Sequence, residues 1–338
     1  MRQILLQIPI PGTDRVLTLY GYGLAMCLGF LAAILLAAWR AKRQNQPPEV
    51  IHNASLAAFF GGVLGARAFF VVQYSGQFPS LWDLVRIWEG GLTFYGGFIV
   101  ATIAVIVYLR ASRRPVLYWL DIIAPSVALG LAFGRLGCLL NGCCYGDVCH
   151  HGWGMVWPAG SIPWQHYADA YAASLGIGPD PGGGAVAGAV TGALAAGWQP
   201  PAIHLTQIYS MVNALLLALV LHTMWRWKRR HGQIILAFAV LYGLTRFLLE
   251  MLRADEAAAY LFGLPTVLRG LGLAEAAQRL PGMTISQNVA IAMVAGGVLG
   301  LVWLARSPRR ELQADYVPPA TAEASGGPGG KRRKERHT

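Results

Sequence analysis

The chain has 338 residues, of which 55% are hydrophobic and 13% charged, and it carries a formal net charge of +11. Soluble domains contain about 25% charged residues, so this composition excludes an ordinary soluble domain and indicates a membrane protein. The positive charge alone would suit a nucleic-acid binder. No nucleic-acid partner is expected, because the basic residues lie mainly in connections between apolar runs, as membrane topology requires.

Seven apolar runs reach the length that a helix needs to cross a bilayer, about 20 residues. The first run lacks a small-residue cleavage site, so we expect it to stay in place as the first helix. The sequence predicts an all-α membrane protein, a seven-transmembrane-helix bundle in one domain over 1–310. The predicted spans are 18–39, 54–76, 91–110, 117–145, 207–225, 232–252 and 284–305.

The basic residues lie mostly in alternate connections, at 40–43, 110–114 and 226–230, and in the tail after Arg306. Cytoplasmic connections are enriched in Lys and Arg, so this pattern predicts an N-terminus outside and a C-terminus inside the cell. The tail at 311–338 is rich in Gly, Pro and Ala before its basic end. We expect a disordered cytoplasmic segment that lies near anionic headgroups.

Two outer connections are longer than a turn, at 146–200 and 254–283, and neither shows strand alternation of any length. The first is rich in Pro, Gly and Trp, which predicts a small irregular periplasmic head over the membrane. Its Gly/Ala tract at 182–197 fits either a flexible insert or a short helix at the interface.

Three arginines interrupt the apolar spans: Arg67, Arg135 and Arg246. A charged side chain at the centre of a membrane helix costs about 2.5–3.5 kcal/mol, so each arginine needs a partner or a cavity. Glu250 follows Arg246 by one helical turn, so a simple neutralising ion pair is one interpretation. For Arg135 the equivalent interpretation is a hydrogen-bonded lock to carbonyl groups of a neighbouring helix.

Helical spacing predicts that the polar residues of the sixth span share one face near its outer end. They are Tyr242, Arg246, Glu250 and Arg253. Arg135 also lies in the outer half of an outward-running helix, so two fixed positive charges can meet at one depth. Guanidinium groups bind phosphate oxygens bidentately, which predicts a site for a phospholipid headgroup. Gly96 and Gly97 allow close backbone approach at the start of the third span.

Five cysteines occur, at positions 27, 138, 143, 144 and 149. The last four, with His150 and His151, are possible zinc or copper ligands, but their spacing matches no ordinary structural zinc site and we expect no metal. A disulfide that involves Cys149 is favoured over a metal in an oxidising outer compartment. Cys27 and Cys138 are expected to be small apolar packing residues.

Several motifs, in this order along the chain, resemble those of the bacterial prolipoprotein diacylglyceryl transferases over roughly 17–305. No single motif is decisive, but their order and spacing together are specific. The motifs are YGLAMCLGF from Tyr22, GARAFF, RIWEGGLTFYGGFIV, GRLGCLLNGCCYG, WGMVWPAGSIPW, HLTQIYS from His204, YGLTRFLLEMLRAD and MTISQNVAIAM.

The resemblance implies a multi-pass enzyme of the bacterial inner membrane, with its active site toward the periplasmic leaflet and no cofactor. Such an enzyme transfers the diacylglyceryl group of phosphatidylglycerol, a membrane lipid, to the lipobox cysteine thiol in the signal peptide of a prolipoprotein. It forms a thioether and releases glycerol-1-phosphate. By the same resemblance, Arg135 matches the phosphatidylglycerol-binding arginine, and Arg246 and Glu250 match a second essential arginine and a glutamate. Tyr22, Asn141 and Gly146 also match family positions, and the expected binding site is completed by Gly96, Gly97 and Arg253.

The chain departs from the family pattern at several positions, and its YGG and GCCYG forms are similar to a recurring branch of the family. A tyrosine stands in place of the histidine that is proposed as the base, and other family residues are replaced as well. The departures are Tyr95 for histidine, Cys138 for asparagine, Cys143 and Ser210 for glutamate, and Leu205 for proline.

The expected reaction is attack by a thiolate on the carbon beside the phosphate ester, so negative charge grows on the leaving phosphate. We expect Arg246 to stabilise that charge, Glu250 to orient Arg246, and Arg135 to hold the headgroup. Tyr95, His204 or water is expected to take the thiol proton. The structural alternative for Tyr95 is a tyrosine at the membrane interface, and the alternative for His204 is a cap at the end of a helix.

Two other functions compete with this enzyme. A lipid transporter would need a polar pathway to both faces of the membrane, whereas the inner half of the spans holds few polar groups apart from Asp121. A non-catalytic phospholipid-binding relative would keep the arginines and lose the base. Thioether formation on a lipobox peptide separates the enzyme from both.

Overall fold

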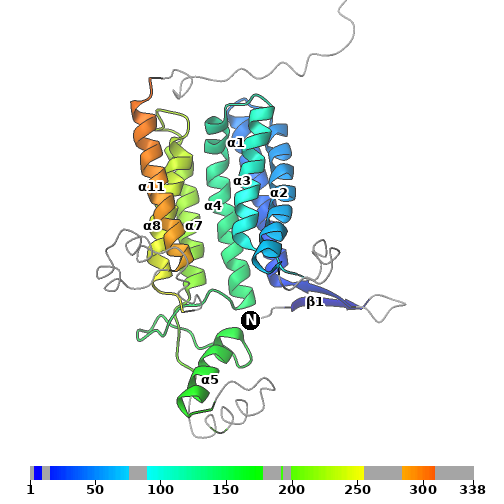
Figure 1. Ribbon diagram of the computed structural model, residues 1–338, viewed down its shortest axis with the longest axis vertical. Coiled ribbons are helices and arrows are strands. Elements are labelled where there is room, and N and C mark those ends of the chain that lie inside the picture. Colours follow the sequence, from blue (N-terminus) through cyan, green and yellow to red (C-terminus); the bar gives the residue numbers. More distant parts are fainter. Residues whose placement is uncertain are drawn as a thin grey trace, which may run out of the picture. The chain divides into compact units, whose positions relative to one another are not determined.

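The computed structural model describes residues 4–9, 16–75, 90–177, 192, 199–254 and 284–308. Seven helices in this part of the chain are long and apolar enough to cross a membrane (Figure 1). They are α1 (Gly21–Arg43), α2 (Glu49–Gln73), α3 (Phe94–Ala111), α4 (Val116–Asn141), α7 (Thr206–Met224), α8 (Gln233–Glu250) and α11 (Ile285–Arg306). The predicted all-α fold with seven spans is confirmed, and the helix ends differ from the predicted ones by a few residues.

The sequence did not predict two further elements. Strands β1 (Ile4–Pro9) and β2 (Val16–Tyr20) pair in antiparallel fashion ahead of α1. Their apolar residues run on toward the first span, which hides the strand signal. Helix α5 (Ile162–Ser174) lies in the predicted head, and Pro163 stands in its first turn, where a proline fits a helix. The head therefore contains a helix beside its irregular segments.

The chain forms two compact units. The first contains β1, β2, α4, α5, α7, α8, α11 and α1 as far as Ala37, and the second contains the last turn of α1 with α2 and α3. In the first unit α4 packs on α7, α7 on α8, and α8 on α11. The buried core of these helices consists of Ala124, Ala128, Leu217, Leu221, Ile234, Ala237 and Phe238.

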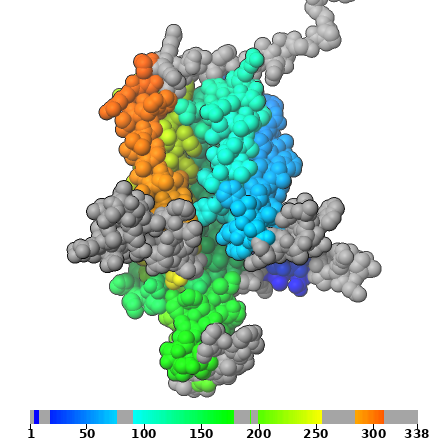
Figure 2. All heavy atoms as spheres, viewed as in Figure 1, coloured from blue at the N-terminus to red at the C-terminus, as the bar shows by residue number. Residues whose placement is uncertain are grey.

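Helix α11 covers one side of the first unit and lies at its surface (Figure 2). Close packing on α8 depends on small residues, because a Cβ added at Gly243 would lie 2.8 Å from the carbonyl oxygen of Ala290. Large apolar side chains of α11, such as Leu299 and Trp303, are exposed. Exposed apolar side chains on a spanning helix suit a surface that faces lipid.

Asp121 ties α4 to the start of α8. Its fully buried carboxylate accepts hydrogen bonds from the backbone N–H groups of Gly232, Ile234 and Ile235 at 2.7, 3.0 and 3.0 Å. The ammonium of Lys228 lies 3.6 Å from the same carboxylate. The free N–H groups at a helix N-terminus favour a negative charge. Asp121 is therefore a structural tie between two spanning helices.

The second unit explains the buried Arg67. Helices α2 and α3 meet at glycines, since a Cβ added at Gly65 would lie 2.6 Å from the carbonyl oxygen of Gly96. Arg67 donates from Nη1 to the carbonyl oxygens of Gly90 and Gly91 at 2.8 and 3.2 Å. This guanidinium therefore satisfies backbone carbonyls just before α3, as a buried charge in a membrane helix requires.

Some expectations fall outside the described residues. These are the tail at 311–338, the Gly/Ala tract apart from residue 192, and the connection at 254–283 after its first residue. The single domain over 1–310 and the orientation of the termini stay predictions.

Candidate functional site

The candidate site begins where α4 ends. Gly142 has a φ of 81° and ends the helix as a left-handed turn. Its N–H and that of Cys143 both donate to the carbonyl oxygen of Cys138, at 2.9 and 3.2 Å. Asn141, the last residue of α4, is partly buried just ahead of this turn. The turn sends the chain back over the end of the helix.

The chain after this turn pairs with two distant segments. Gly146 donates to the carbonyl of His204, and His204 donates to that of Asp147, both at 3.0 Å. Asp147 donates to the carbonyl of Leu252 at 2.9 Å, and Gly146 forms a bridge with Arg253. A Cβ added at Gly146 would lie 2.6 Å from the Cβ of His204. The close pairing therefore requires glycine, and it brings the ends of α4 and α8 to the start of α7.

Glu250 lies at the end of α8 between two arginines. Its Oε2 is 2.6 Å from Nη1 of Arg246 and 3.1 Å from Nη1 of Arg253, and its side chain is fully buried. The ion pair between Arg246 and Glu250 that the spacing suggested is therefore present. Among the described residues, two guanidinium groups therefore share this one carboxylate at the end of α8.

Two residues at the start of α11 join this cluster, and the sequence analysis did not identify them. Thr284 donates from Oγ1 to Oε1 of Glu250 at 3.3 Å, and Arg246 donates from Nη2 to Oγ of Ser286 at 2.8 Å. Thr284 and Gln287 form a capping box, a sequence signal that marks the helix start. That signal does not reveal which distant side chain the cap contacts.

Arg135 lies near the same end of α4 and is partly buried. It interacts electrostatically with Tyr242, Cys144 and Arg253, which places it beside the end of α8. In the described part of the chain, no hydrogen bond or ion pair engages its guanidinium. Tyr22 on α1 also lies within electrostatic range of Arg135. The guanidinium of Arg135 is therefore a candidate anion-binding group.

The predicted base candidates lie in different units. His204, just before α7, has its Nδ1 atom 3.4 Å from the hydroxyl of Tyr209. Tyr95 belongs to the first turn of α3 in the second unit, together with Gly96 and Gly97. Both glycines pack against α2, since a Cβ added at Gly97 would lie 3.1 Å from the carbonyl oxygen of Gly62. The catalytic and binding roles of these residues stay predictions.

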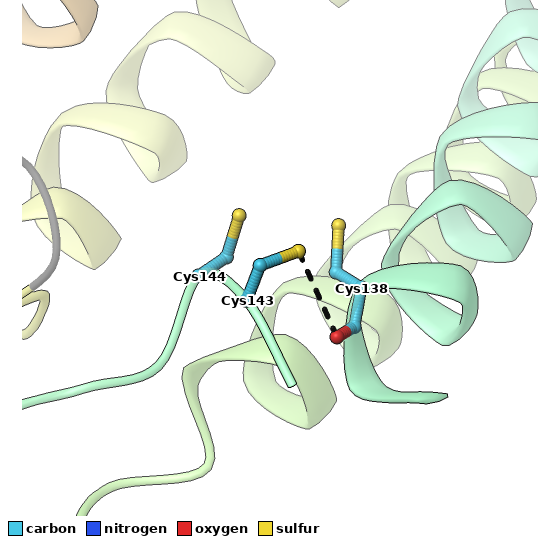
Figure 3. Close-up of side chains that lie close together, drawn as sticks. All are labelled: Cys138, Cys143 and Cys144. Atoms are coloured by element: carbon cyan, nitrogen blue, oxygen red, sulfur yellow. Dashed lines mark hydrogen bonds between the residues drawn. The ribbon is translucent and has the colours of Figure 1, made fainter. Parts of the chain in front are cut away.

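All five cysteines lie in the described part of the chain, and none of them is disulfide-bonded there. The thiol of Cys149, for which a disulfide was favoured, donates to the carbonyl oxygen of His151 at 3.2 Å. Cys138, Cys143 and Cys144 converge instead, with sulfur atoms that all lie within 4.8 Å of one another (Figure 3). The spacing did not predict this cluster, because the turn at Gly142 folds the last two cysteines back toward the first.

The head packs on the loop that carries the site. Tyr145, Trp157 and Ile203 form a buried apolar cluster, and Tyr167 of α5 packs against it. Burial raises the pKa of the Tyr167 phenol to about 12, so this side chain is neutral at physiological pH. The head therefore supports the site loop through apolar contacts and the backbone pairing of Ile203 with Met155.

Comparison with known proteins identifies the family of the chain. The family model for prolipoprotein diacylglyceryl transferase matches residues 13–303. A phosphatidylglycerol–prolipoprotein diacylglyceryl transferase of Rhodopirellula baltica is 40% identical over 48% of the chain, a match that covers 36% of that relative's length. A protein of the same name from Clostridium tetani is 29% identical, over 71% of the chain and 82% of the relative. Another from Sodalis glossinidius is 27% identical, over 87% of the chain and 92% of the relative.

The match runs through all seven spanning helices and the loop that joins α4 to α7. The chain belongs to the prolipoprotein diacylglyceryl transferase family, the multi-pass membrane transferases of lipoprotein biosynthesis.

Proposed function

We propose that this protein transfers the diacylglyceryl group of phosphatidylglycerol to the lipobox cysteine thiol of prolipoproteins. Family membership supports this activity, and one structural observation carries it. At the joined ends of α4 and α8, the carboxylate of Glu250 contacts the guanidinium groups of Arg246 and Arg253, and Arg135 lies within electrostatic range of Arg253. Three guanidinium groups that gather inside a membrane bundle suit a phosphate headgroup.

The reaction forms one bond and breaks one. The sulfur of the lipobox cysteine attacks the glycerol carbon that bears the phosphate ester. The carbon–oxygen bond breaks, and the oxygen leaves with the phosphate as glycerol-1-phosphate. The thiol proton passes to a base or to water. The leaving phosphate gains one negative charge, so fixed positive charge beside it lowers the barrier.

The roles follow from position and charge. Arg135 binds the headgroup phosphate, because its guanidinium has no counter-ion among the described residues. Arg246 stabilises the leaving phosphate, and Glu250 holds Arg246 in place through the 2.6 Å contact. By the family resemblance, binding roles are also proposed for Tyr22, Asn141, Gly146 and Arg253 in the first unit and for Gly96 and Gly97 in the second.

The protein acts in the bacterial inner membrane, with the site toward the periplasmic leaflet. The basic connection at 226–230 supports this orientation, because it joins the ends of α7 and α8 that lie opposite the site loop. Tyr95 before two glycines and the GCCYG sequence support the proposal that the chain belongs to a branch of the family that lacks the usual histidine.

The proton acceptor is Tyr95, His204 or water. Removing a general base costs about 100-fold or more in rate. The variants Tyr95→Phe and His204→Gln, compared by initial rate at matched expression, separate the three. A loss of that size in one variant assigns the proton transfer to its residue, and full activity assigns the residue to packing.

The test of the function uses purified protein in detergent with phosphatidylglycerol and a synthetic lipobox peptide. We expect the peptide to gain the mass of a diacylglyceryl group, and the matched peptide with serine in place of cysteine to stay unmodified. A lipid transporter or a non-catalytic relative leaves the cysteine peptide unmodified as well, and that result would overturn the proposal.

A further inference from the structure

The three cysteines at the end of α4 are held together by the backbone around them. Cys138 lies in the last turn of the helix, and Cys143 and Cys144 follow the turn at Gly142. Figure 3 shows the three side chains gathered at one place. Their sulfur atoms lie within 4.8 Å of one another. All three are partly buried. No role for them follows from the proposed binding of phosphate.

The backbone of this segment is fixed in an unusual conformation. Cys144 has a φ of 60°, which few residues other than glycine adopt, so surrounding contacts must hold it. Thr206 donates to the carbonyl oxygen of Cys144 at 2.7 Å, and Gln207 donates to that of Cys143 at 2.9 Å. These contacts from α7 fix the two carbonyls, and the Cys143 thiol points toward Cys138 and donates to its carbonyl oxygen at 3.8 Å (Figure 3).

The separation of the sulfurs suits one zinc ion. A zinc–sulfur bond is about 2.3 Å, so two thiolates on a tetrahedral zinc lie about 3.8 Å apart. The sulfur atoms already lie within 4.8 Å of one another, so side-chain rotation alone can bring them to this separation. A disulfide would use two of these cysteines and would not explain why the third converges on them.

Charge and hydrogen bonding around the cluster also suit a metal. Three thiolates and Zn²⁺ carry one net negative charge, and Arg135 interacts electrostatically with both Cys138 and Cys144. Gln207 is fully buried, and its Oε1 atom has no hydrogen-bond partner among the described residues. An unsatisfied buried acceptor calls for a donor, which a metal-bound water supplies.

We propose that Cys138, Cys143 and Cys144 bind one Zn²⁺ through three thiolates and leave its fourth position open for the lipobox cysteine thiol of the substrate. The inference rests on the proposed function for the identity of that thiol. Three protein ligands with one open position are typical of catalytic zinc. A thiol that binds zinc loses its proton, so the substrate becomes a thiolate without a nearby histidine.

The step balances without any redox change. The substrate S–H releases its proton to water as sulfur binds zinc. The thiolate then attacks the glycerol carbon, the carbon–oxygen bond breaks, and glycerol phosphate leaves with that oxygen. The zinc stays Zn²⁺ and releases the thioether, because a thioether is a weaker ligand than a thiolate.

The first experiment measures metal binding on the full chain, reduced and purified in detergent. Zinc is titrated against a chromogenic chelator, and cadmium is titrated by its thiolate absorption. We expect one metal per chain in the wild type and in Cys27→Ser, which changes an exposed cysteine elsewhere on the protein. The variants Cys138→Ser, Cys143→Ser and Cys144→Ser should each lose stoichiometric binding. A reduced wild type that binds no zinc, or variants that bind like it, would overturn the site.

The second experiment tests the open position. Cobalt-loaded protein should change its thiolate absorption when the lipobox cysteine peptide is added and not when the serine peptide is added. Chelated protein should lose thioether formation and regain it with zinc. If chelated protein keeps full activity, the thiol-binding role is wrong while the proposed function stands. If zinc binds through the cysteines but no form of the protein modifies the peptide, the proposed function fails and the metal site stands.

Discussion

Glu250 is the residue on which the charges at the end of α8 depend. It is fully buried and contacts Arg246, Arg253 and Thr284. A buried carboxylate of this kind neutralises part of the charge and fixes the direction of both guanidinium groups. Under the proposed function, the two guanidinium groups are then held in one defined place for a phosphate.

We predict that Glu250→Gln lowers both stability and activity. Removing one partner from a buried ion pair costs about 3–5 kcal/mol, because the remaining charges lose their compensation. The thermal unfolding midpoint of the detergent-solubilised protein and the initial rate of thioether formation should both fall. Glu49→Gln is the control, since Glu49 is exposed at the start of α2. An unchanged midpoint in Glu250→Gln would contradict the account of this cluster.

Local spacing predicted some contacts of the site and could not predict others. Arg246 and Glu250 are one helical turn apart, so the sequence alone was sufficient to predict their ion pair. Ser286 reaches Arg246 from a helix 40 positions later in the chain, and no periodic pattern encodes that contact. The cysteine cluster depends on the left-handed turn at Gly142, which spacing rules for metal sites do not include.

At the scale of elements, the seven helices were predictable because each is a long apolar run. The strands β1 and β2 were not, because apolar residues beside a spanning helix give no separate signal. The pairing of the site loop with the segments around His204 and Leu252 was not predictable either. That pairing decides which helix ends meet, and it depends on a glycine.

We predict that Gly146→Ala reduces activity more than the same substitution at an exposed glycine does. An added Cβ would lie 2.8 Å from the carbonyl oxygens of both His204 and Leu252, so the paired segments must separate. Gly152→Ala is the matched control, because nothing lies within 4 Å of a Cβ added there. Initial rates at matched expression give the comparison. Equal rates for the two variants would show that the pairing does not position the site.

The contact of Asp121 with the start of α8 should matter for stability and not for chemistry. Asp121→Asn removes the charge that faces three N–H groups and Lys228, so the unfolding midpoint should fall clearly. Asp169→Asn changes an exposed residue of α5 and should leave the midpoint unchanged. At a temperature where both proteins are folded, the rate of transfer should match that of the wild type. A loss of transfer without loss of stability would assign Asp121 to the reaction.

At the scale of the whole molecule, the charge pattern predicts the orientation in the membrane. The connection at 226–230 is basic and joins α7 to α8. The site loop and the head lie at the other ends of these two helices. A site on the external side would meet prolipoproteins as their signal peptides emerge there. The positive-inside rule therefore connects sequence to the side on which the substrate arrives.

Two exposed tryptophans test this orientation as a matched pair. Trp153 in the head is 80% exposed, and Trp227 in the basic connection is 74% exposed. In a Cys27→Ser background, a membrane-impermeant maleimide should label Trp153→Cys in spheroplasts. It should label Trp227→Cys only after the membrane is permeabilised. The reverse pattern would contradict the proposed topology.

The central claim is that Arg135 and Arg246 hold the phosphate of phosphatidylglycerol during transfer. The direct test is the initial rate of thioether formation from labelled phosphatidylglycerol in Arg135→Gln and Arg246→Gln, with Arg110→Gln, an exposed residue of α3, as the control. Loss of one charge-stabilising contact typically costs about 100-fold to 1,000-fold in rate. The account predicts losses of that size in both variants, with unfolding midpoints near the wild type and full activity in the control. Wild-type rates in folded Arg135→Gln and Arg246→Gln would contradict it.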